Sequence, residues 1–402
     1  MKKTALIVIL ALIPVLAIAG TGRAKYVFFF IGDGMGFNHV SLAEYYSGHT
    51  EGLHGSLPLS FSAFPVLGWA VTHSASNLIT DSAAAGTALS TGTKTNNGML
   101  ATAPDSTTSL KSISYKIHEA GYRVGISSTV GLNHATPAAF YGSSISRNDY
   151  YGIAAQIPAC GFEFLAGGGL IDSRGSDGNC TSAYDIIENS GYTIAEGLDD
   201  FAGKKNSTDR IMLLQENGRE RTELPFAIDR SATDMTQADL VRASIDFLYS
   251  EDGPGFLIMS EGGKIDWASH SNDTKAARLE TISLSDAVAV AVAFYEQHPD
   301  ETLIVVTADH ETGGLTLGLE DGYNLYFDKI DSIDCSRDKA SEDGKDMMKE
   351  LSREARIGWT TSDHSAANVP VFAIGVGSSL FSGRMDNTEI PERICKAMNI
   401  IF

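Results

Sequence analysis

A hydroxyl and a carboxylate stand side by side in the segment 79-ITDSAAAGT-87, ahead of a run of small residues. Asp81 and Ser82 are both favoured at helix N-caps, and the alanines that follow are strong helix formers. We expect residues 77–80 to end a buried strand, so that Ser82 opens a helix. One interpretation of this pair is a helix cap alone, and the other is a serine placed to act as a nucleophile.

A second set of residues has the spacing of metal ligands. Asp266 and His270 are four residues apart, so on a helix they project from one face and can share an ion. Carboxylate oxygen and imidazole nitrogen form a common zinc ligand set, although a helical ion pair has the same spacing. His364, just ahead of a predicted strand, offers a third ligand for such a zinc site.

Further polar groups directly follow apolar runs. Asp309 and His310 close one run, and beyond the strand end both can reach one ion together with Asp33. Glu261 closes another run, and with a hydroxyl it forms an oxygen-only environment that suits magnesium. Two zinc ions and one magnesium ion are chemically consistent with these ligands. The other histidines lack carboxylates at suggestive spacings and are predicted to be structural or on the surface: His39, His49, His54, His73, His118 and His298.

The elements that must position these groups are strands and helices in alternation. Apolar, strand-like runs end in polar residues or glycine within the segments 25–36, 122–130, 162–169, 255–261, 302–310 and 369–377. Helical patterns lie between several of them, at 108–121 and 276–298. Such alternation is typical of an α/β fold with a mainly parallel central sheet between helices. Ligands of these sheets lie outside the carboxyl ends of the strands, which is where the candidate residues stand.

We predict a single domain, residues 25–402, because no linker or tandem repeat divides the pattern. A polar, charge-dense stretch predicts a small surface insertion around residues 315–360. The chain has a net charge of −20, which argues against nucleic acid or anionic membranes as partners. Bound metal ions can reverse that field locally, so an anionic small-molecule substrate is compatible with the charge.

Residues 1–24 have the layout of a secretory signal peptide. Two lysines precede an apolar run, and a small-x-small cleavage site ends at Ala19. The run is shorter than the roughly 20 apolar residues of a membrane anchor. We predict cleavage after Ala19 or Ala24, of which the second fits the start of the first strand better. The mature protein is expected to be periplasmic or secreted, without a membrane span.

Four cysteines in an exported chain suggest two disulfides. Three pairings are possible. We favour Cys160–Cys180, which spans a glycine-rich loop, and this leaves Cys335–Cys395 as the second pair. The spacing of the four matches no zinc site.

Taken together, these segments resemble the alkaline phosphatase family. The run 79-ITDSAAAGT-87 resembles the nucleophile signature of that family. The similarity continues in the same order through 32-GDGMG-36, 131-GLNHATPAAFYGSSISR-147, 261-EGGKIDWASH-270, 308-ADHETGG-314 and 363-DHSAANVPVFAIG-375. It covers nearly all of the chain after residue 24. The resemblance implies an alkaline phosphatase-like α/β fold and, as is common in the family, a homodimer.

The resemblance also implies a role for each candidate residue. Ser82 is expected to become phosphoserine, and Arg147 to grip two phosphate oxygens with its planar fork. The ligands expected for the first zinc ion are Asp266, His270 and His364. Those expected for the second are Asp33, Asp309 and His310, with the Ser82 hydroxyl. Magnesium is expected to bind Asp33, Thr136 and Glu261.

Two positions of the implied site vary within the family. This chain has His134 beside an expected magnesium ligand and Trp267 directly after Asp266. Some other members carry an aspartate and a lysine there. Both side chains are expected to face the substrate phosphate. His134 leaves open whether the third site holds magnesium or zinc.

The function implied is the hydrolysis of phosphate monoesters to an alcohol and inorganic phosphate. Broad specificity for small molecules is expected, because the catalytic elements of the family grip only the phosphoryl end. One alternative is a phosphodiesterase or sulfatase of the same superfamily, which usually carries threonine or a modified cysteine as nucleophile. Another is a catalytically silent metal- or phosphate-binding protein of the cell envelope. Ser82 together with Arg147 favours the monoesterase, and no part of the machinery is missing.

A lysine can bind phosphate through water and Trp267 cannot, so we expect weak binding and fast release of product phosphate. Trp267→Lys should lower the inhibition constant of inorganic phosphate by about tenfold, the scale of one hydrogen bond to a charged group. Steady-state inhibition kinetics check this, with Trp267→Phe as a control that keeps an aromatic ring and adds no charge. An inhibition constant unchanged by the lysine contradicts the expectation.

Overall fold

The computed structural model describes residues 22–402. Residues 1–21 of the predicted signal peptide, with the cleavage site after Ala19, therefore lie outside the described residues, whereas the predicted site after Ala24 lies within them. Within the described part, no helix combines the length and the apolar character needed to cross a membrane.

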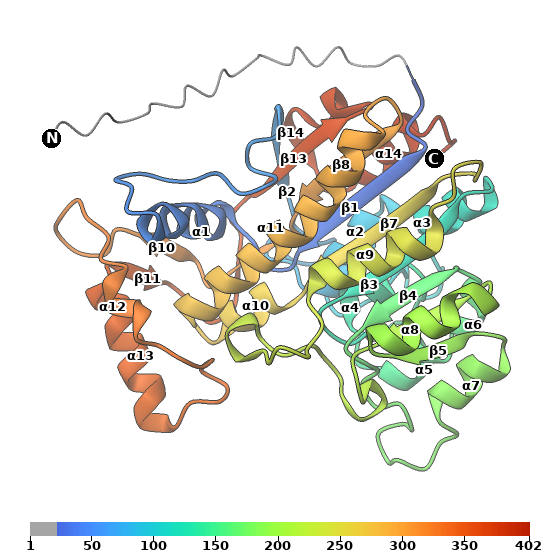
Figure 1. The fold of residues 1–402 in the computed structure, drawn as a ribbon, viewed down its shortest axis with the longest axis horizontal. Helices are drawn as coiled ribbons and strands as arrows, with labels where there is room; N and C mark the ends of the chain where they lie inside the picture. Colours follow the sequence, from blue (N-terminus) through green and yellow to red (C-terminus); the bar gives the residue numbers. More distant parts are fainter. Residues whose placement is uncertain (1–21) are drawn as a thin grey trace, which may run out of the picture.

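A ten-stranded sheet runs through the centre of the molecule (Figure 1). From one edge to the other its strands are β14 (Gly383–Asp386), β2 (Val66–Val71), β13 (Val369–Gly375), β8 (Thr302–Thr307), β1 (Tyr26–Gly32), β7 (Phe256–Gly262), β3 (Arg123–Ser128), β4 (Phe164–Gly167), β6 (Ile211–Leu214) and β5 (Thr193–Glu196). Of these strands only β13 is antiparallel to its neighbours, β2 and β8. The predicted α/β fold with a mainly parallel sheet is confirmed.

Helices cover both faces of this sheet. The helices of the described part, of which α12 and α13 lie away from this sheet, are α1 (Phe37–Thr50), α2 (Ser82–Thr91), α3 (Ile113–Glu119), α4 (Ala135–Ala138), α5 (Tyr150–Ala154), α6 (Ile157–Cys160), α7 (Ala183–Asn189), α8 (Leu198–Lys204), α9 (Gln237–Leu248), α10 (Lys264–His270), α11 (Thr274–Gln297), α12 (Asp328–Asp331), α13 (Glu342–Glu354) and α14 (Glu389–Ala397). Short 3-10 turns are η1 (Lys205–Ser207), η2 (Gly218–Glu220), η3 (Ala227–Asp229) and η4 (Ser378–Phe381). Helices α9 and α11 pack on one face, and α2, α3 and α14 lie on the other (Figure 1).

The central strand β1 shows why its sequence is apolar throughout. All seven of its residues are buried, because β7 and β8 flank it and helices cover both of its faces. On one face the ring of Phe28 packs against Phe256 and Phe294, with ring centroids 5.3 and 5.5 Å apart. Phe294 belongs to α11, so these aromatic contacts fix that long helix over the sheet.

The strand expected over residues 77–80 is absent, so that prediction was wrong. Leu78 is 83% exposed, and Ile79 is also exposed. The side chains of nearby polar residues satisfy the backbone here: the Asn77 amide donates to Ser74 Oγ, and Asn97 donates to the Ile79 carbonyl. The segment is an irregular loop, and β2, which precedes it, was missed.

The stretch predicted as a surface insertion forms a small layer beside α1. Strand β10 (Leu315–Leu317) pairs with β11 (Ile357–Trp359), and α12 and α13 lie between them in sequence. These elements bury a separate apolar cluster that includes Leu42 of α1.

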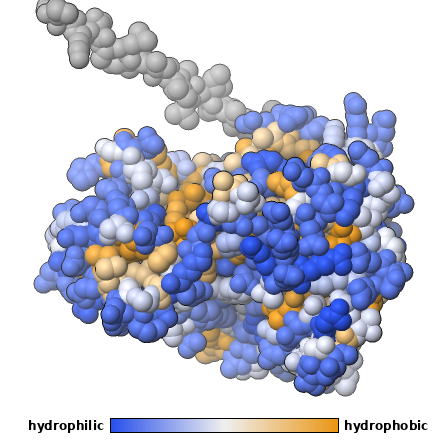
Figure 2. Space-filling view, turned by 60° about the horizontal axis from the view of Figure 1, so that its bottom comes forward, coloured by the Kyte–Doolittle hydropathy of each residue, from blue (hydrophilic) through white to orange (hydrophobic). Residues whose placement is uncertain are grey.

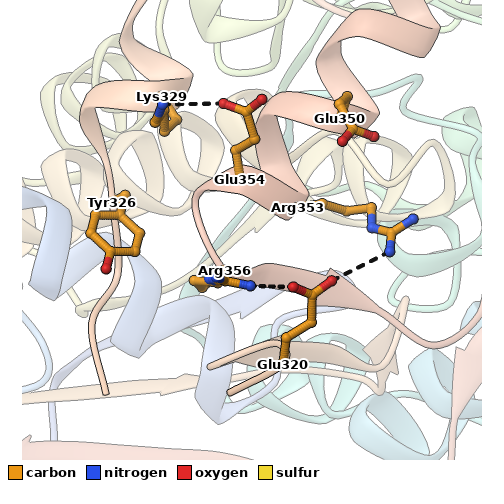
Figure 3. Close-up of a pocket in the computed structure, with 7 residues that line it drawn as sticks. All are labelled: Glu320, Tyr326, Lys329, Glu350, Arg353, Glu354 and Arg356. Atoms are coloured by element: carbon orange, nitrogen blue, oxygen red, sulfur yellow. Dashed lines mark hydrogen bonds and ion pairs between the residues drawn. The ribbon is translucent and has the colours of Figure 1, made fainter. Parts of the chain in front are cut away.

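A pocket of about 570 Å³ opens on this layer (Figure 3). Three acidic and three basic side chains line it, and all but Glu350 form ion pairs with one another. Glu320 binds Arg353 and Arg356, and Lys329 Nζ lies 3.2 Å from a carboxylate oxygen of Glu354. The pocket is therefore close to electrically balanced. Figure 2 shows hydrophilic residues over most of one face of the molecule, with smaller apolar patches among them.

All four cysteines are free, so the predicted disulfides are not present in this structure. Cys160 is buried at the end of α6, with its sulfur 3.5 Å from the Tyr192 hydroxyl, whereas Cys180 is exposed. Cys395 is buried in the main core within α14, while Cys335 follows α12 in the inserted layer.

Thiol counting tests this arrangement. The unfolded protein should react with four equivalents of a thiol reagent without prior reduction, and dithiothreitol should leave the melting temperature unchanged. In the native protein Cys180 should react fastest, because it is exposed. A count of zero or two thiols after unfolding contradicts the prediction.

Candidate active site

Helix α2 presents Ser82 at its first turn. Asp81 is the N-cap, and its carboxylate accepts a hydrogen bond of 3.0 Å from the Ala84 amide. All ten residues of the helix are buried, and its small side chains allow this close packing. A Cβ atom added at Gly86 would lie only 3.3 Å from Thr136 Cα. The helix thus carries the Ser82 hydroxyl into the interior.

The turn after β1 places Asp33 in the same region. Gly34 has a φ of 76°, and a Cβ there would lie 2.9 Å from the backbone of Asp266. Only glycine fits this backbone conformation and this close approach. The glycine therefore allows Asp33 and Asp266 to converge from distant parts of the chain.

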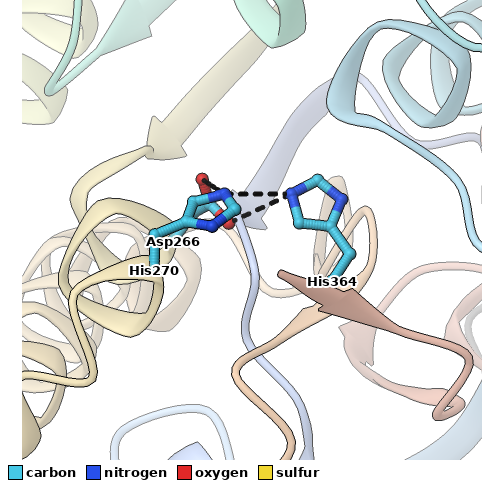
Figure 4. A group of neighbouring side chains, drawn as sticks. All are labelled: Asp266, His270 and His364. Atoms are coloured by element: carbon cyan, nitrogen blue, oxygen red, sulfur yellow. Dashed lines mark hydrogen bonds and ion pairs between the residues drawn. The ribbon is translucent and has the colours of Figure 1, made fainter. Parts of the chain in front are cut away.

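Asp266, His270 and His364 form the first group of potential metal ligands (Figure 4). A carboxylate oxygen of Asp266 lies 3.3 Å from His270 Nε2, and the other lies 3.6 Å from His364 Nε2. The two Nε2 atoms face each other at 3.2 Å. His270 Nδ1 lies 2.6 Å from the Ser362 carbonyl and His364 Nδ1 lies 2.8 Å from the Thr80 carbonyl. These contacts leave both Nε2 atoms directed at one point between the side chains.

Asp33, Asp309 and His310 come together beside the first group. His310 Nε2 lies 3.4 Å from Asp33 and 3.2 Å from Asp309, and all three side chains are fully buried. The Ser82 hydroxyl is 3.3 Å from the same nitrogen. The rings of His310 and His364 stack with centroids 3.5 Å apart, so the two groups are immediate neighbours.

A third group consists of Asp33, His134 and Glu261, with their potential ligand atoms within 4.8 Å of one another. Ser128 donates a hydrogen bond to Glu261 and fixes its carboxylate. Thr136 is fully buried on α4, two residues after His134. The Asp33 carboxylate belongs to this group and also lies within the same range of Asp266 and His310.

The donor atoms of these groups suit cations. Buried polar atoms normally have hydrogen-bond partners, and an unpartnered one is costly. Six buried atoms of this site lack one among the described residues: both carboxylate oxygens of Asp33, Asp309 Oδ2, Glu261 Oε1, Thr136 Oγ1 and His134 Nδ1. Metal ions would satisfy all of them, because the atoms are carboxylate, hydroxyl and imidazole donors.

The pKa shifts of the buried carboxyl groups also indicate that this site suits cations. Burial, with the neighbouring charge of Asp309, raises the pKa of Asp33 well above its usual range. Burial also raises the pKa of Glu261 to about 7 and that of Asp309 to about 8. Burial opposes ionisation of Asp266, but the hydrogen bond with His270 holds the Asp266 pKa below its usual value. That contact raises the pKa of His270 to about 9. Without a bound cation, the carboxyl groups with raised pKa values keep their protons, which lowers the negative charge that the site has to bury.

Arg147 reaches the same region from a loop after α4. One guanidinium nitrogen lies 3.1 Å from the Asp81 carboxylate, and the other lies 3.3 Å from His134 Nε2. The side chain is partly exposed. The ring of Trp267 packs edge-on against His134 with centroids 5.8 Å apart. All residues proposed from the sequence therefore gather at the carboxyl ends of β1, β7 and β8, with Arg147, His134 and Trp267 around them.

The six other histidines lie outside the three ligand groups. His39 is fully buried, and it contacts Ser269 Oγ at 2.9 Å. His118 pairs with Glu163 at 3.1 Å, away from the site.

Sequence reasoning missed two supporting residues, Thr312 and Ser128, and one further role of Asp81. Thr312 donates to Asp266 at 2.5 Å and lies 3.2 Å from His310 Nδ1, so it joins two ligand groups. Ser128 fixes Glu261, and Asp81 holds Arg147 in addition to capping α2. Thr312 lies two residues after His310, and this spacing beyond a strand end was the only signal in the sequence.

Comparisons with known proteins agree with this geometry. The family model described as alkaline phosphatase matches residues 24–164 and 201–400. Alkaline phosphatase 3 of Bacillus subtilis (strain 168) is 29% identical, over 93% of this chain and 89% of that protein.

Solved structures show the same similarity. The alkaline phosphatase from the Antarctic bacterium TAB5 is 30% identical, with a TM-score of 0.76 over 94% of this chain and 99% of that one. A cold-active alkaline phosphatase from a psychrophilic Shewanella sp. is 29% identical, with a TM-score of 0.80 over 93% and 99% of the two chains. A mutant of the TAB5 enzyme has Mg bound in its M3 site. The family match spans most of the chain, and we conclude that it belongs to the alkaline phosphatases, metal-binding hydrolases of phosphate monoesters.

Proposed function

We propose that this chain hydrolyses phosphate monoesters through a phosphoserine intermediate on Ser82, at a site for two zinc ions and a third cation. The observation that supports this most strongly is the position of the Ser82 hydroxyl. It lies 3.3 Å from His310 Nε2, beside carboxylates whose buried oxygens have no partner among the described residues. A hydroxyl there would share a cation with those groups.

Three sets of side chains would hold the ions. The first zinc ion would bind Asp266, His270 and His364, and the second would bind Asp33, Asp309 and His310. The third cation would bind Asp33, Thr136 and Glu261, with His134 in reach. Bound zinc ions lower the pKa of a coordinated hydroxyl and stabilise charge on the attacking and leaving oxygens of an in-line displacement.

Ser82 has no evident general base. The nearby His310 Nε2 also faces Asp33 and Asp309, and burial holds the pKa of His310 well below its usual value. This nitrogen suits a metal ligand better than a proton acceptor. The serine therefore depends on coordination rather than on an imidazole for activation.

Arg147 and α2 would receive the phosphoryl oxygens. The guanidinium fork matches two oxygens at once, and Asp81 holds one end of it at 3.1 Å. The first amides of α2 point toward the Ser82 end of the helix, where the helix dipole favours an anion. The site contacts only the phosphoryl group in this arrangement, which supports broad specificity for the alcohol.

The third cation is either magnesium or zinc. Asp33, Glu261 and Thr136 are oxygen donors that suit magnesium, whereas an imidazole such as His134 favours zinc. Export to the periplasm or the exterior, and assembly as a homodimer, complete the proposal. The basic and apolar residues 1–24 support export, and the family resemblance supports the dimer.

Removal of the nucleophile tests the proposed chemistry. Ser82→Ala should lower kcat for p-nitrophenyl phosphate by about a thousandfold or more, because the covalent route is lost. A chelator should abolish the activity of the unmodified protein, and zinc with magnesium should restore it. Ser90→Ala, a buried serine on the same helix, is the matched control and should stay active. Full activity in Ser82→Ala would refute the mechanism.

In the metal-free protein, the protons kept by these buried groups make the free energy of unfolding depend on pH. The pKa values of Glu261, Asp309 and His270 are raised to about 7, 8 and 9 in the folded state. A raised folded pKa stabilises the fold at low pH, and this stabilisation is lost as pH rises through the folded value. Three buried histidines have lowered pKa values and act in the opposite sense, but only below about pH 6.5: His39, His134 and His310.

Between pH 6.5 and pH 9 the metal-free protein should therefore lose stability relative to the metal-loaded protein. Urea unfolding at fixed pH, with chelator or with zinc and magnesium, measures the difference in free energy of unfolding. That difference should widen with rising pH, and Asp309→Asn should flatten the trend, because one titrating group is removed. A difference that narrows with pH contradicts the prediction.

Thr312 should tune metal affinity without binding a metal itself. Its hydroxyl contacts Asp266 and His310, ligands of different proposed zinc sites. Thr312→Val should weaken zinc binding by about 10- to 100-fold, the usual effect of losing an outer-shell partner. Competition with a zinc chelator measures this. Thr302→Val also removes a buried hydroxyl, but at the far end of β8, and should leave zinc affinity unchanged.

A further inference from the structure

The imidazole of His134 has different neighbours at its two nitrogens. Nε2 lies 3.3 Å from a guanidinium nitrogen of Arg147. Nδ1 is buried and has no hydrogen-bond partner among the described residues. His134 forms the third ligand group together with Asp33 and Glu261. The ring therefore stands between the proposed third cation site and the arginine that would grip phosphate.

The contact with Arg147 determines where the proton of this imidazole lies. A guanidinium has donors only, so Nε2 must accept the hydrogen bond. A neutral imidazole then carries its single proton on Nδ1. A second proton, on Nε2, would place two donors against each other in this 3.3 Å contact, so the ring that accepts from Arg147 is neutral.

A cation in the third site requires the opposite arrangement. Metal ions bind the lone pair of an imidazole nitrogen, so Nδ1 must give up its proton. The neutral ring then carries a proton on Nε2, supplied by solvent as the first proton is released, and the net proton count does not change. Nε2–H and the guanidinium N–H groups of Arg147 would then be two donors facing each other, which cannot form a hydrogen bond.

We propose that His134 couples the third cation to phosphate binding by changing its tautomer. With the site empty, His134 accepts a hydrogen bond from Arg147 and occupies one of its donors. With a cation at Nδ1, that bond is lost, and His134 Nε2–H and the freed Arg147 donor both become available to phosphate oxygens. This inference rests on the proposed function, because it takes the region between Ser82 and Arg147 as the phosphate site.

Two contacts hold the side chains of Arg147 and His134 in place when the hydrogen bond between them is lost. The salt bridge between Arg147 and Asp81, at 3.1 Å, does not involve His134 and keeps the guanidinium in place. The edge-on packing of Trp267 restrains the imidazole plane. By linkage, phosphate must raise the affinity of the third cation by the same factor as the cation raises that of phosphate.

The tautomer can be observed directly. Nitrogen-15 NMR of histidine-labelled protein, loaded with only two equivalents of zinc so that the third site stays empty, distinguishes protonated from unprotonated ring nitrogens, and His134→Gln identifies the signals of this residue. Without magnesium, Nε2 of His134 should be unprotonated. On titration with magnesium, Nε2 should become protonated. Protonation of Nε2 both before and after titration, or of Nδ1 in the magnesium-loaded protein, overturns the proposal.

Phosphate affinity gives a second readout. Calorimetry with inorganic phosphate, with and without magnesium on the zinc-loaded protein, measures the coupling. The charge of the cation by itself also favours phosphate binding. The variant His134→Gln measures this contribution alone, because its amide oxygen can still bind the ion while its NH₂ group is always a donor. Magnesium should tighten phosphate binding about tenfold more in the unmodified protein than in His134→Gln. Equal coupling in both proteins overturns the proposal.

Failure of this inference is distinct from failure of the proposed function. If p-nitrophenyl phosphate hydrolysis depends on Ser82 and on metal but the tautomer does not change, only the coupling is wrong. If the unmodified protein shows no chelator-sensitive hydrolysis, the proposed function fails first.

Discussion

The burial of four carboxylates in one small volume is the constraint on which the rest of this structure depends. Asp33, Glu261, Asp266 and Asp309 are all nearly or fully inaccessible to water, and they approach one another from three strand ends and one helix. Negative charges cannot be crowded in this way without protons or cations to balance them. In the metal-free protein, the raised pKa values of Asp33 and Asp309 keep these carboxyl groups protonated. Bound cations would replace those protons, at the histidines and at the carboxylate oxygens that have no hydrogen-bond partner among the described residues.

The fold makes this concentration of charge possible. Parallel neighbours β1, β7 and β8 end at one edge of the sheet, so residues far apart in sequence emerge side by side. The short pairing of β12 (His364–Ser365) with β9 (Glu311–Thr312) then brings His364 next to Thr312. Small residues in α2 let the serine approach the same volume. Aromatic packing far from the site, as around Phe28, supplies the stability that such a polar centre lacks.

Much of this architecture could be predicted because its signals are local. Apolar runs such as that of β1 reveal buried parallel strands, and the spacing of Asp266 and His270 reveals one face of a helix. The loop at 77–80 was misjudged because Leu78 and Ile79 look like a strand, while its real partners, such as Asn97, are distant side chains. Thr312 and the contact between Arg147 and His134 depend on tertiary geometry alone. No pattern in the sequence could have specified which nitrogen of His134 faces which group.

Anomalous diffraction from crystals of the purified protein, measured on both sides of the zinc absorption edge, tests the central claim most directly. The account predicts two zinc peaks, one between Asp266, His270 and His364 and one between Asp33, Asp309 and His310, with a third ion near Glu261. Well-ordered side chains with no ion among them, in crystals grown with zinc and magnesium, would show that these carboxylates are balanced by protons alone and would contradict the account.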